Sequence, residues 1–217
     1  MIHLENTRAV SRNETVPFHC RMCGECCRDI ADSIMLEPMD AYRLARYLRE
    51  RGAPVTGTED VLARYAHAAW LEDCLPVFLL DTVGTADACV FLKDGRCSMY
   101  EARPRVCRLY PFSVGPGNRG RAFQYVLCTE KPHHFADSMV MVKDWLSQNF
   151  SREARAVLKA DYDALPGLGQ TIRAMGRERF KRLAFQFLYY RYYNYNLDEP
   201  FLPQFLSNLE KLRKLIV

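Results

Sequence analysis

Four cysteines fall within eight residues near the start of the chain, in the segment Cys20-Arg21-Met22-Cys23-Gly24-Glu25-Cys26-Cys27. Hydrophobic packing does not require such a cluster. A metal centre does, because thiolates must converge on one point and short C-x2-C steps let the backbone curl around it. The fold therefore has to bring these thiols together around bound inorganic ions.

Four of the five other cysteines follow at wider intervals and complete the predicted set of metal ligands: Cys89, Cys97, Cys107 and Cys128. Eight thiolates are enough for two four-coordinate centres, or for one cluster with four structural thiols. Cys20, Cys23 and Cys26 have the C-x2-C-x2-C spacing that binds three irons of one cluster, with a distant cysteine as the fourth ligand. Neighbouring side chains diverge, so we expect Cys27 to serve a second centre or to be a free or redox-active thiol.

The spacing favours an iron–sulfur cluster, [4Fe-4S], over zinc. A four-cysteine zinc ribbon carries two C-x2-C knuckles, and only the first cluster offers that spacing. Zinc remains the alternative. Inert or disulfide-bonded cysteines are less favoured because the total of nine is odd. Cys74, the ninth cysteine, lies between two apolar stretches and is predicted to be a small core residue rather than a ligand.

Length and composition limit the class of protein. The 217 residues can build one substantial domain, or a domain with a helical extension. The longest apolar runs are far too short to cross a bilayer, and the N-terminal segment does not resemble a signal peptide. We therefore expect a cytoplasmic protein without a membrane partner, in a reducing compartment that favours metal ligation over disulfides. A net charge of +4 does not imply nucleic acid.

The residue pattern predicts an α+β, mainly helical fold, in which a small cysteine-ligated domain of loops and hairpins packs on a C-terminal helical bundle. A cysteine-bearing region, residues 1–132, precedes a helical region, residues 133–217, and the two fold separately or share one core. In the first region we expect helices from Pro38 to Gly52 and from Thr58 to about Leu71, strands over 77–80 and 90–92, and hairpins over 89–100 and 112–128. The first hairpin is expected to turn at Lys93-Asp94-Gly95, with Cys89 and Cys97 near its two ends. In the second we expect helices over 137–149, 151–163, 170–193 and 199–216.

The cysteine-bearing region also carries a specific resemblance. The motifs are CRMCGECCR at residues 20–28, CVFLKDGRCSMYEARPRVCRLYPF at residues 89–112, and then Cys128. They resemble the YkgJ-type cysteine-cluster family, which is described as a zinc- or iron-chelating domain. The resemblance covers residues 18–128, about half of the chain, and implies metal binding. The cysteine motif is also similar to that of flagellin lysine N-methylases, which implies a [4Fe-4S] cluster, S-adenosylmethionine as a second cofactor, and protein lysine methylation as an alternative function.

Basic residues surround the later cysteines, and Arg103, Arg105 and Arg108 are the candidate cofactor-binding residues, with Arg119 and Arg121 further along the chain. Guanidinium groups would offset the negative charge of a thiolate-bound cluster. They also suit a carboxylate such as that of S-adenosylmethionine. A solvated basic face is an equally consistent interpretation.

Three weaker patterns remain. Residues 115–120 match G-x-G-x-x-G, but the strand pattern that follows predicts a hairpin loop rather than a dinucleotide site. His133 and His134 could supply a ligand or proton relay, although we favour a surface pair at a helix entry because neither has a metal partner at fixed spacing. The aromatic segment 185–195 follows several arginines, which leaves an RNA-binding or assembly module as a third function. A buried helix explains that segment better, so nucleic acid is an unlikely partner, and the partner protein or small molecule is unknown.

Overall fold

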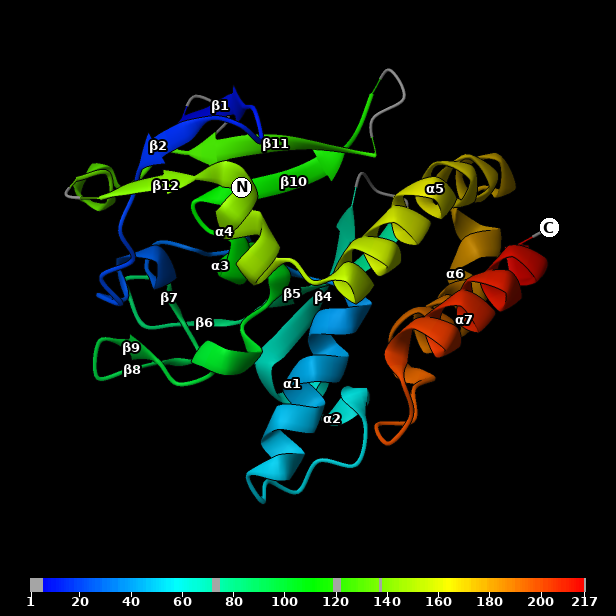
Figure 1. Cartoon of the computed structure of the whole chain (residues 1–217). Coiled ribbons are helices and arrows are strands. Elements are labelled where there is room, and N and C mark those ends of the chain that lie inside the picture. Colours follow the sequence, from blue (N-terminus) through cyan, green and yellow to red (C-terminus); the bar gives the residue numbers. More distant parts are fainter. Residues whose placement is uncertain (1–5, 72–74, 119–121, 137, 217) are drawn as a thin grey trace. The chain divides into compact units, whose positions relative to one another are not determined.

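The computed structural model describes residues 6–71, 75–118, 122–136 and 138–216 (Figure 1). The chain divides into two compact units, and both are discontinuous in sequence. Unit 1 comprises Met1–Ile34 and Asp81–Arg152, and unit 2 comprises Met35–Leu80 and Glu153–Val217. This division differs from the boundary expected near residue 132, because unit 2 takes its first part from between the two groups of cysteines. The α+β, mainly helical fold class is confirmed.

Unit 1 is built on a three-stranded antiparallel sheet with the order β1-β11-β10 (Figure 1). Its strands are β1 (Thr7–Val10), β10 (Phe112–Pro116) and β11 (Phe123–Cys128). Strands β10 and β11 form the hairpin predicted over residues 112–128, with Phe112 opposite Leu127 and both side chains buried. The register of β1 places Thr7 opposite Cys128, so the last predicted ligand lies at the end of the central strand.

A second strand pair in unit 1 joins segments far apart in sequence. Strand β2 (Thr15–Pro17) pairs with β12 (Met139–Met141), which leads into helix α4 (Val142–Asn149). The helix predicted from residue 137 therefore begins later, because residues 139–141 pair with β2 instead. Beyond the strands, the N–H of Phe18 donates to the carbonyl of Ser138, and the N–H of His19 donates to the carbonyl of His134. The chain just before Cys20 is thereby fixed against the chain around His134.

Two small hairpins carry Cys89 and Cys97. The first pairs β6 (Thr82–Val83) with β7 (Ala88–Cys89), and the second pairs β8 (Leu92–Lys93) with β9 (Arg96–Cys97). The prediction of one hairpin with both cysteines near its ends was wrong in extent, because Cys89 lies opposite Thr82. The turn at Asp94 and Gly95 is confirmed, with φ values of 49° and 72° as a two-residue hairpin loop requires.

The core of unit 1 centres on Phe18, which is 1% exposed. Its ring packs edge-on against Trp145 and Tyr110, with centroids 5.3 and 5.9 Å apart. Tyr110 follows two short helices, η3 (Tyr100–Ala102) and α3 (Arg105–Leu109), and the peptide bond to Pro111 is cis. The Trp145 indole N–H donates to the carbonyl of Leu109, which connects α4 to the end of α3. This aromatic core holds the later cysteine motif against the β2–β12 pair.

Unit 2 contains a second antiparallel sheet, of order β3-β5-β4, formed by β3 (Met35–Leu36), β4 (Ala66–Leu71) and β5 (Leu75–Leu80). Helix α1 (Pro38–Glu50) begins as predicted, with a capping box between Glu37 and Asp40. Helix α2 (Thr58–Tyr65) is shorter than predicted. Residues 66–71 pair with β5 along their whole length, so strand pairing overrides the helical pattern there.

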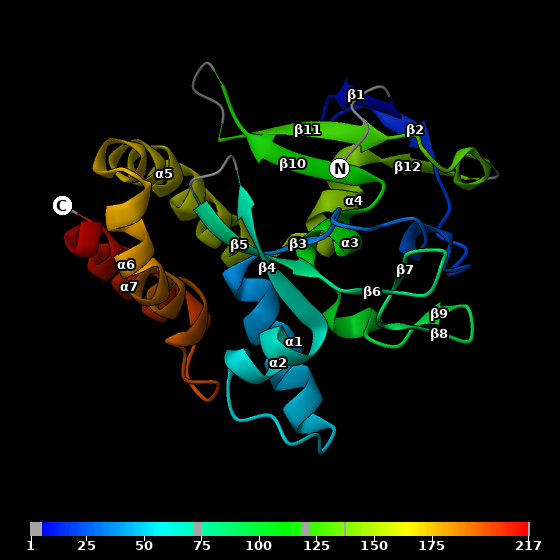
Figure 2. The same cartoon turned by 180° about the vertical axis from the view of Figure 1, so that it is seen from behind.

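The remaining helices of unit 2 are α5 (Arg152–Met175), α6 (Arg177–Leu188), the π-helix η5 (Tyr189–Tyr193) and α7 (Phe201–Ile216) (Figure 2). The break predicted between residues 163 and 170 was wrong, because α5 continues through Pro166. Buried apolar residues on both sides of the proline, including Leu158 and Leu168, hold one helical face together. The chain breaks instead at Gly176, which has a φ of 83°. Among the described residues, none of the helices has the length and apolar character needed to span a membrane.

The aromatic segment lies largely in the core of unit 2, as we favoured. Phe187, Tyr192 and Tyr195 are buried, whereas Phe185 and Tyr189 are exposed. The Tyr192 hydroxyl donates to the carbonyl of Leu36, within the same unit. The buried members of this segment therefore pack in the core of unit 2.

A buried ion pair joins this segment to α5. The guanidinium of Arg191 makes two hydrogen bonds to the Asp161 carboxylate, at 2.7 and 2.9 Å, and both side chains are 6% exposed. Burial by itself would lower the pKa of Arg191, and the charge of Asp161 more than offsets that effect. Arg191 therefore stays charged in the folded protein.

Substitution of Asp161 tests the importance of this pair. Asp161→Asn leaves the Arg191 charge buried without its counter-charge, so the free energy of unfolding should fall by about 3–5 kcal/mol. Asp163, on the same helix, forms an exposed pair with Lys159, and Asp163→Asn should cost no more than about 1 kcal/mol. Urea unfolding followed by circular dichroism measures both values. Equal losses in the two variants would contradict a dominant role for the buried pair.

Candidate metal centre

The loop that carries the first cysteines is curled by two residues with left-handed backbone conformation. Met22 has a φ of 50° and Gly24 a φ of 75°, so the chain turns on both sides of Cys23. The 3-10 turn η2 (Glu25–Cys27) follows, and the N–H of Cys27 donates to the carbonyl of Gly24. Cys23 therefore precedes the turn, whereas Cys26 and Cys27 lie on it.

This loop is held directly against the two hairpins of unit 1. A Cβ atom on Gly24 would lie 2.5 Å from the Gly95 carbonyl oxygen and 2.8 Å from a methyl carbon of Leu92. The N–H groups of Asp29 and Ile30 donate to the carbonyls of residues 86 and 87, at 3.0 and 3.1 Å. Only glycine allows the backbone to approach this closely with a positive φ. The approach brings the first cysteine cluster to the hairpins that carry Cys89 and Cys97.

Five cysteines become electrostatic neighbours as a result, and we call them the thiol group: Cys26, Cys27, Cys89, Cys97 and Cys107. Cys27 hydrogen bonds to Cys26, and the charges of Cys107 and Cys89 raise the pKa of Cys27. The charge of Cys26 in turn raises the pKa of Cys89 and of Cys97. Such effects require short separations. The structure thus gathers thiols from the cysteine loop, both hairpins and α3.

One member of the thiol group has a lowered pKa, whereas its neighbours have raised ones. The hydrogen bond from Cys27 lowers the pKa of Cys26 to about 7, and the positive charges of Arg103 and Lys131 act in the same direction. Burial is the leading cause that raises the pKa of Cys89 and of Cys97. The thiolate is the form that binds metal, and within the thiol group Cys26 is the member whose pKa is shifted toward that form.

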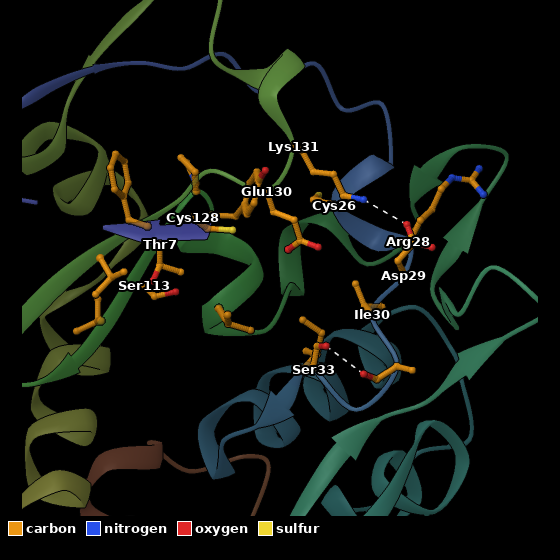
Figure 3. Close-up of a pocket in the computed structure, with 18 of the residues that line it drawn as sticks. Thr7, Cys26, Arg28, Asp29, Ile30, Ser33, Ser113, Cys128, Glu130 and Lys131 are labelled. Carbon is orange, nitrogen blue, oxygen red and sulfur yellow. Dashed lines mark hydrogen bonds and ion pairs between the residues drawn. The ribbon is translucent and has the colours of Figure 1, made fainter. Parts of the chain in front are cut away.

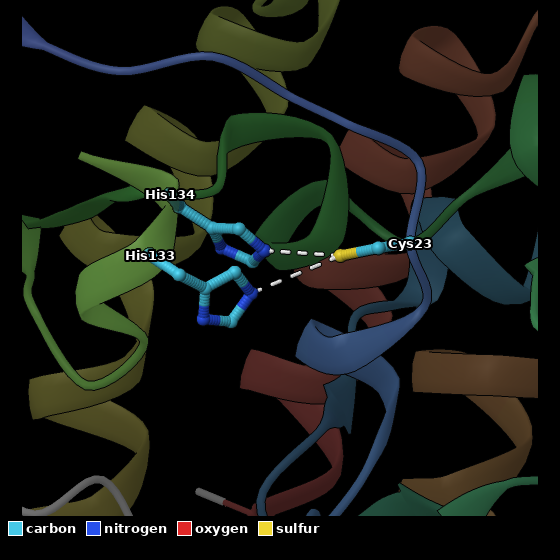
Figure 4. Close-up of side chains that lie close together, drawn as sticks. All are labelled: Cys23, His133 and His134. Atoms are coloured by element: carbon cyan, nitrogen blue, oxygen red, sulfur yellow. Dashed lines mark hydrogen bonds between the residues drawn. The ribbon is translucent and has the colours of Figure 1, made fainter. Parts of the chain in front are cut away.

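Cys23 contacts two histidines. Its Sγ lies 3.2 Å from Nε2 of His134 and 4.0 Å from Nε2 of His133 (Figure 4). In the described part of the chain, these three are the only Cys, His, Asp or Glu side chains whose ligand atoms form a group within 4.8 Å. His134 is 4% exposed, and burial, followed by the charge of His133, lowers its pKa.

The favoured interpretation of His133 and His134 as a surface pair was therefore wrong for His134. Sequence reasoning searched for a ligand at short, fixed spacing, whereas Cys23 lies 110 residues before His133. The β2–β12 pairing decides their proximity. The useful signal in the sequence was the presence of two adjacent imidazoles shortly after Cys128.

The other two predicted ligands lie at the edges of this region. Cys20 is half-buried at the start of the loop, directly after His19. Cys128 ends strand β11, and burial raises its pKa. Cys128 and Cys26 both line one pocket of about 520 Å³ (Figure 3).

That pocket combines an apolar side with charged residues of both signs. The apolar lining includes Ile30, Val106 and Phe112. The charged lining consists of Arg28, Asp29, Glu130 and Lys131, and Lys131 Nζ lies 3.3 Å from the Asp29 carboxylate. Cys26 belongs to both the thiol group and the pocket wall, so a bound small molecule would lie beside the thiols.

The three candidate arginines have different surroundings. Arg103 lies 3.6 Å from the centre of the Tyr100 ring and donates to the Tyr100 carbonyl. Its charge helps to lower the pKa of Cys26 and partly offsets the rise that burial causes in the pKa of Cys97. Arg108 is buried, and within the described residues its Nε and Nη1 have no hydrogen-bond partner. Arg105 begins α3. Arg103 is thus the one whose charge acts on the thiol group. Cys74, Arg119 and Arg121 lie outside the described residues.

Comparison with protein families gives this geometry a context. Residues 19–134, more than half of the chain, match the CxxCxxCC family, whose description is "putative zinc- or iron-chelating domain". The chain belongs to the CxxCxxCC family. The matched region includes the loop, both hairpins, the thiol group and the two histidines. The family description assigns a metal-chelating domain to these residues.

A curated relative is less informative. The chain is 29% identical over 101 residues to an uncharacterized protein, MJ0661, of Methanocaldococcus jannaschii, a match that covers 46% of this chain. The chain spans about half of the relative's length, 47%. No solved structure matches the chain.

The close approach of Gly24 can be tested with a matched glycine. Gly24→Ala creates a backbone clash as well as strain at positive φ, and overpacking of this kind costs about 1–3 kcal/mol. Gly84 has a similar φ of 72°, but a Cβ atom added there would meet nothing within 4 Å, so Gly84→Ala carries the backbone strain alone. Bound metal per chain, measured by elemental analysis, should fall severalfold in the first variant and stay near the wild-type value in the second. Equal metal contents would argue against the approach as the element that assembles the site.

Proposed function

We propose that the thiol group of this CxxCxxCC protein holds an iron–sulfur cluster, [4Fe-4S], and that unit 1 is a metal-binding module built around it. The observation that carries the proposal is the close approach of the cysteine loop to both hairpins, which makes its thiols electrostatic neighbours of Cys89, Cys97 and Cys107. Thiolates are soft ligands that favour iron–sulfur clusters and zinc over hard cations. The choice therefore lies between a cluster and a zinc ion.

The spacing of the sulfurs favours the cluster. Four thiolates satisfy a tetrahedral zinc ion, with sulfurs about 3.8 Å apart at a zinc–sulfur distance of 2.3 Å. The thiol group has five members, and among the described residues no three of their sulfurs lie within 4.8 Å of one another. A cluster separates its cysteine ligands more widely than one ion does, because the irons and inorganic sulfides lie between them.

The surrounding charge also suits a cluster. A cluster bound by four thiolates is anionic, and nearby positive groups stabilise it and raise its reduction potential. Arg103 and Lys131 already act electrostatically on Cys26. Since the ligands come from distant segments, binding would also contribute to the folding of unit 1.

Anaerobic purification tests the proposal. Iron, acid-labile sulfide and a visible absorption spectrum should together indicate one [4Fe-4S] cluster per chain. Cys89→Ser should lower the iron and sulfide contents severalfold because it removes one ligand of the thiol group. Cys74→Ser is the control, since Cys74 is the one cysteine outside the predicted ligand set, and it should leave both contents unchanged. A colourless protein with zinc but no sulfide would contradict the cluster proposal and identify zinc as the bound metal.

A second candidate function is methyl transfer from S-adenosylmethionine to a protein lysine, and the pocket beside Cys26 is what favours it. Its volume of about 520 Å³ lies within the range of small-molecule sites. Lys131 and Arg28 suit the carboxylate of a zwitterionic cofactor, whereas Asp29 and Glu130 suit its ammonium and sulfonium groups. In such a reaction the sulfonium methyl bonds to the lysine nitrogen, S-adenosylhomocysteine leaves, and the nitrogen loses a proton.

Labelled S-adenosylmethionine separates this function from metal binding alone. The holoprotein should label a protein in cell extract, and Ser113→Phe should abolish labelling because Ser113 lines the pocket. Ser147→Phe introduces the same side chain at an exposed position on α4 and should retain the label. Absence of labelled product with the wild-type holoprotein would exclude the methyltransferase function under these conditions, while the cluster proposal would stand on its metal analysis.

A further inference from the structure

We propose that Cys23, His133 and His134 bind one zinc ion at a site separate from the thiol group. The proposal goes beyond the cluster proposed above and does not depend on it. It rests on the convergence of one thiol and two imidazoles that come from opposite ends of the family-matched region. Figure 4 shows both rings directed toward the same sulfur.

The donor atoms already lie close to the spacing that zinc imposes. With zinc–sulfur and zinc–nitrogen distances of 2.3 and 2.0–2.1 Å, tetrahedral geometry separates the donors by about 3.4–3.6 Å. The two Nε2 atoms lie 3.2 and 4.0 Å from the sulfur of Cys23. All three ligand atoms fall within 4.8 Å of one another. Small rotations of exposed His133 would complete the geometry.

A second layer of contacts orients His134. Its Nδ1 lies 2.9 Å from the Tyr110 hydroxyl, so an Nδ1–H that donates to this oxygen leaves the Nε2 lone pair facing Cys23. Histidines that bind metal usually have such a partner on the other ring nitrogen. Phe18 packs edge-on against both His134 and Tyr110. The imidazole is therefore held in the orientation that a metal needs.

The backbone fixes both sides of the site. On the histidine side, His134 accepts a hydrogen bond from the N–H of His19 at 3.1 Å, next to the β2–β12 pair. On the cysteine side, the positive φ values of Met22 and Gly24 turn the chain on both sides of Cys23. A preorganised site of this kind loses little conformational entropy when it binds an ion.

A simple thiol–imidazole hydrogen bond does not explain the second histidine. One imidazole is enough for such a bond, and His134 provides it at 3.2 Å. The His133 ring lies 4.2 Å from the His134 ring, with its own Nε2 toward the same sulfur. Two imidazoles and one thiolate match the three protein ligands of zinc sites that keep a fourth position for water. His133 is exposed, so the solvent has access to the site on that side.

Metal analysis of full-length variants tests the site. His133→Gln and His134→Gln should each lower zinc by one equivalent per chain, while iron and sulfide stay unchanged. His133 is exposed, so His133→Gln should preserve the fold. The control is His19→Gln, which alters a nearby exposed histidine but keeps its backbone N–H, and it should retain the zinc. Cys89→Ser should show the converse, with iron and sulfide lost and the histidine-dependent zinc kept.

Two further measurements exclude an indirect effect of folding. Tyr110→Phe removes only the partner of Nδ1, so zinc affinity in competition with a chelator should weaken by about 10- to 100-fold without loss of the site. Cobalt(II) bound to the wild-type protein should give the absorption of a tetrahedral, thiolate-ligated ion, and this signal should disappear in His133→Gln. Unchanged zinc in both histidine variants, or a parallel loss of zinc, iron and sulfide, would overturn the proposal. If the thiol group held zinc instead of a cluster, the total would be higher but the histidine-dependent equivalent would still be lost, so the two proposals fail separately.

Discussion

The approach of Gly24 to the hairpin turn at Gly95 is the contact on which the architecture of unit 1 depends. The Gly24 backbone comes so close to the Gly95 carbonyl that no side chain fits between them. Hydrogen bonds from Asp29 and Ile30 to the neighbouring hairpin extend the same contact. Backbone complementarity therefore brings the cysteines together, and bound metal would reinforce an arrangement that the fold already favours.

In the two metal sites that we propose, one short motif contributes to two kinds of donor set because the backbone turns within it. Cys23 precedes the η2 turn and faces the imidazoles of His133 and His134, whereas Cys26 and Cys27 lie on the turn and face thiols. A soft, all-sulfur environment and a mixed sulfur–nitrogen environment favour different inorganic partners. The pocket lies beside the first of these, with Cys26 in its wall. The same loop could therefore hold a redox-capable cluster, a Lewis-acidic ion and one wall of a ligand site.

Unit 2 is held together by other interactions than unit 1. It wraps helices and a small antiparallel sheet around aromatic side chains, and it retains a buried pair between Asp161 and Arg191. Tyrosine hydroxyls in this core find backbone carbonyls, as Tyr192 does with Leu36. The arginine and tyrosine residues of this core that could suggest nucleic-acid binding are engaged in these contacts. Burying a polar group costs free energy unless the group has a hydrogen-bond partner, and these buried polar groups have such partners.

The residue pattern was enough to predict those features of the protein that depend on local chemistry. These are the membership of a metal-chelating family, the α+β mainly helical class, the start of α1 at Pro38, the β10–β11 hairpin and the Asp94-Gly95 turn. Each follows from spacing, capping or turn preference within a few residues. The tertiary structure alone decided the end of α2 at Tyr65, the continuation of α5 through Pro166 and the pairing of Cys23 with His134. Those outcomes depend on strand pairing and packing between segments far apart in the chain. A local residue pattern contains no information about which distant segment will bond to a given backbone group or pack against a given side chain.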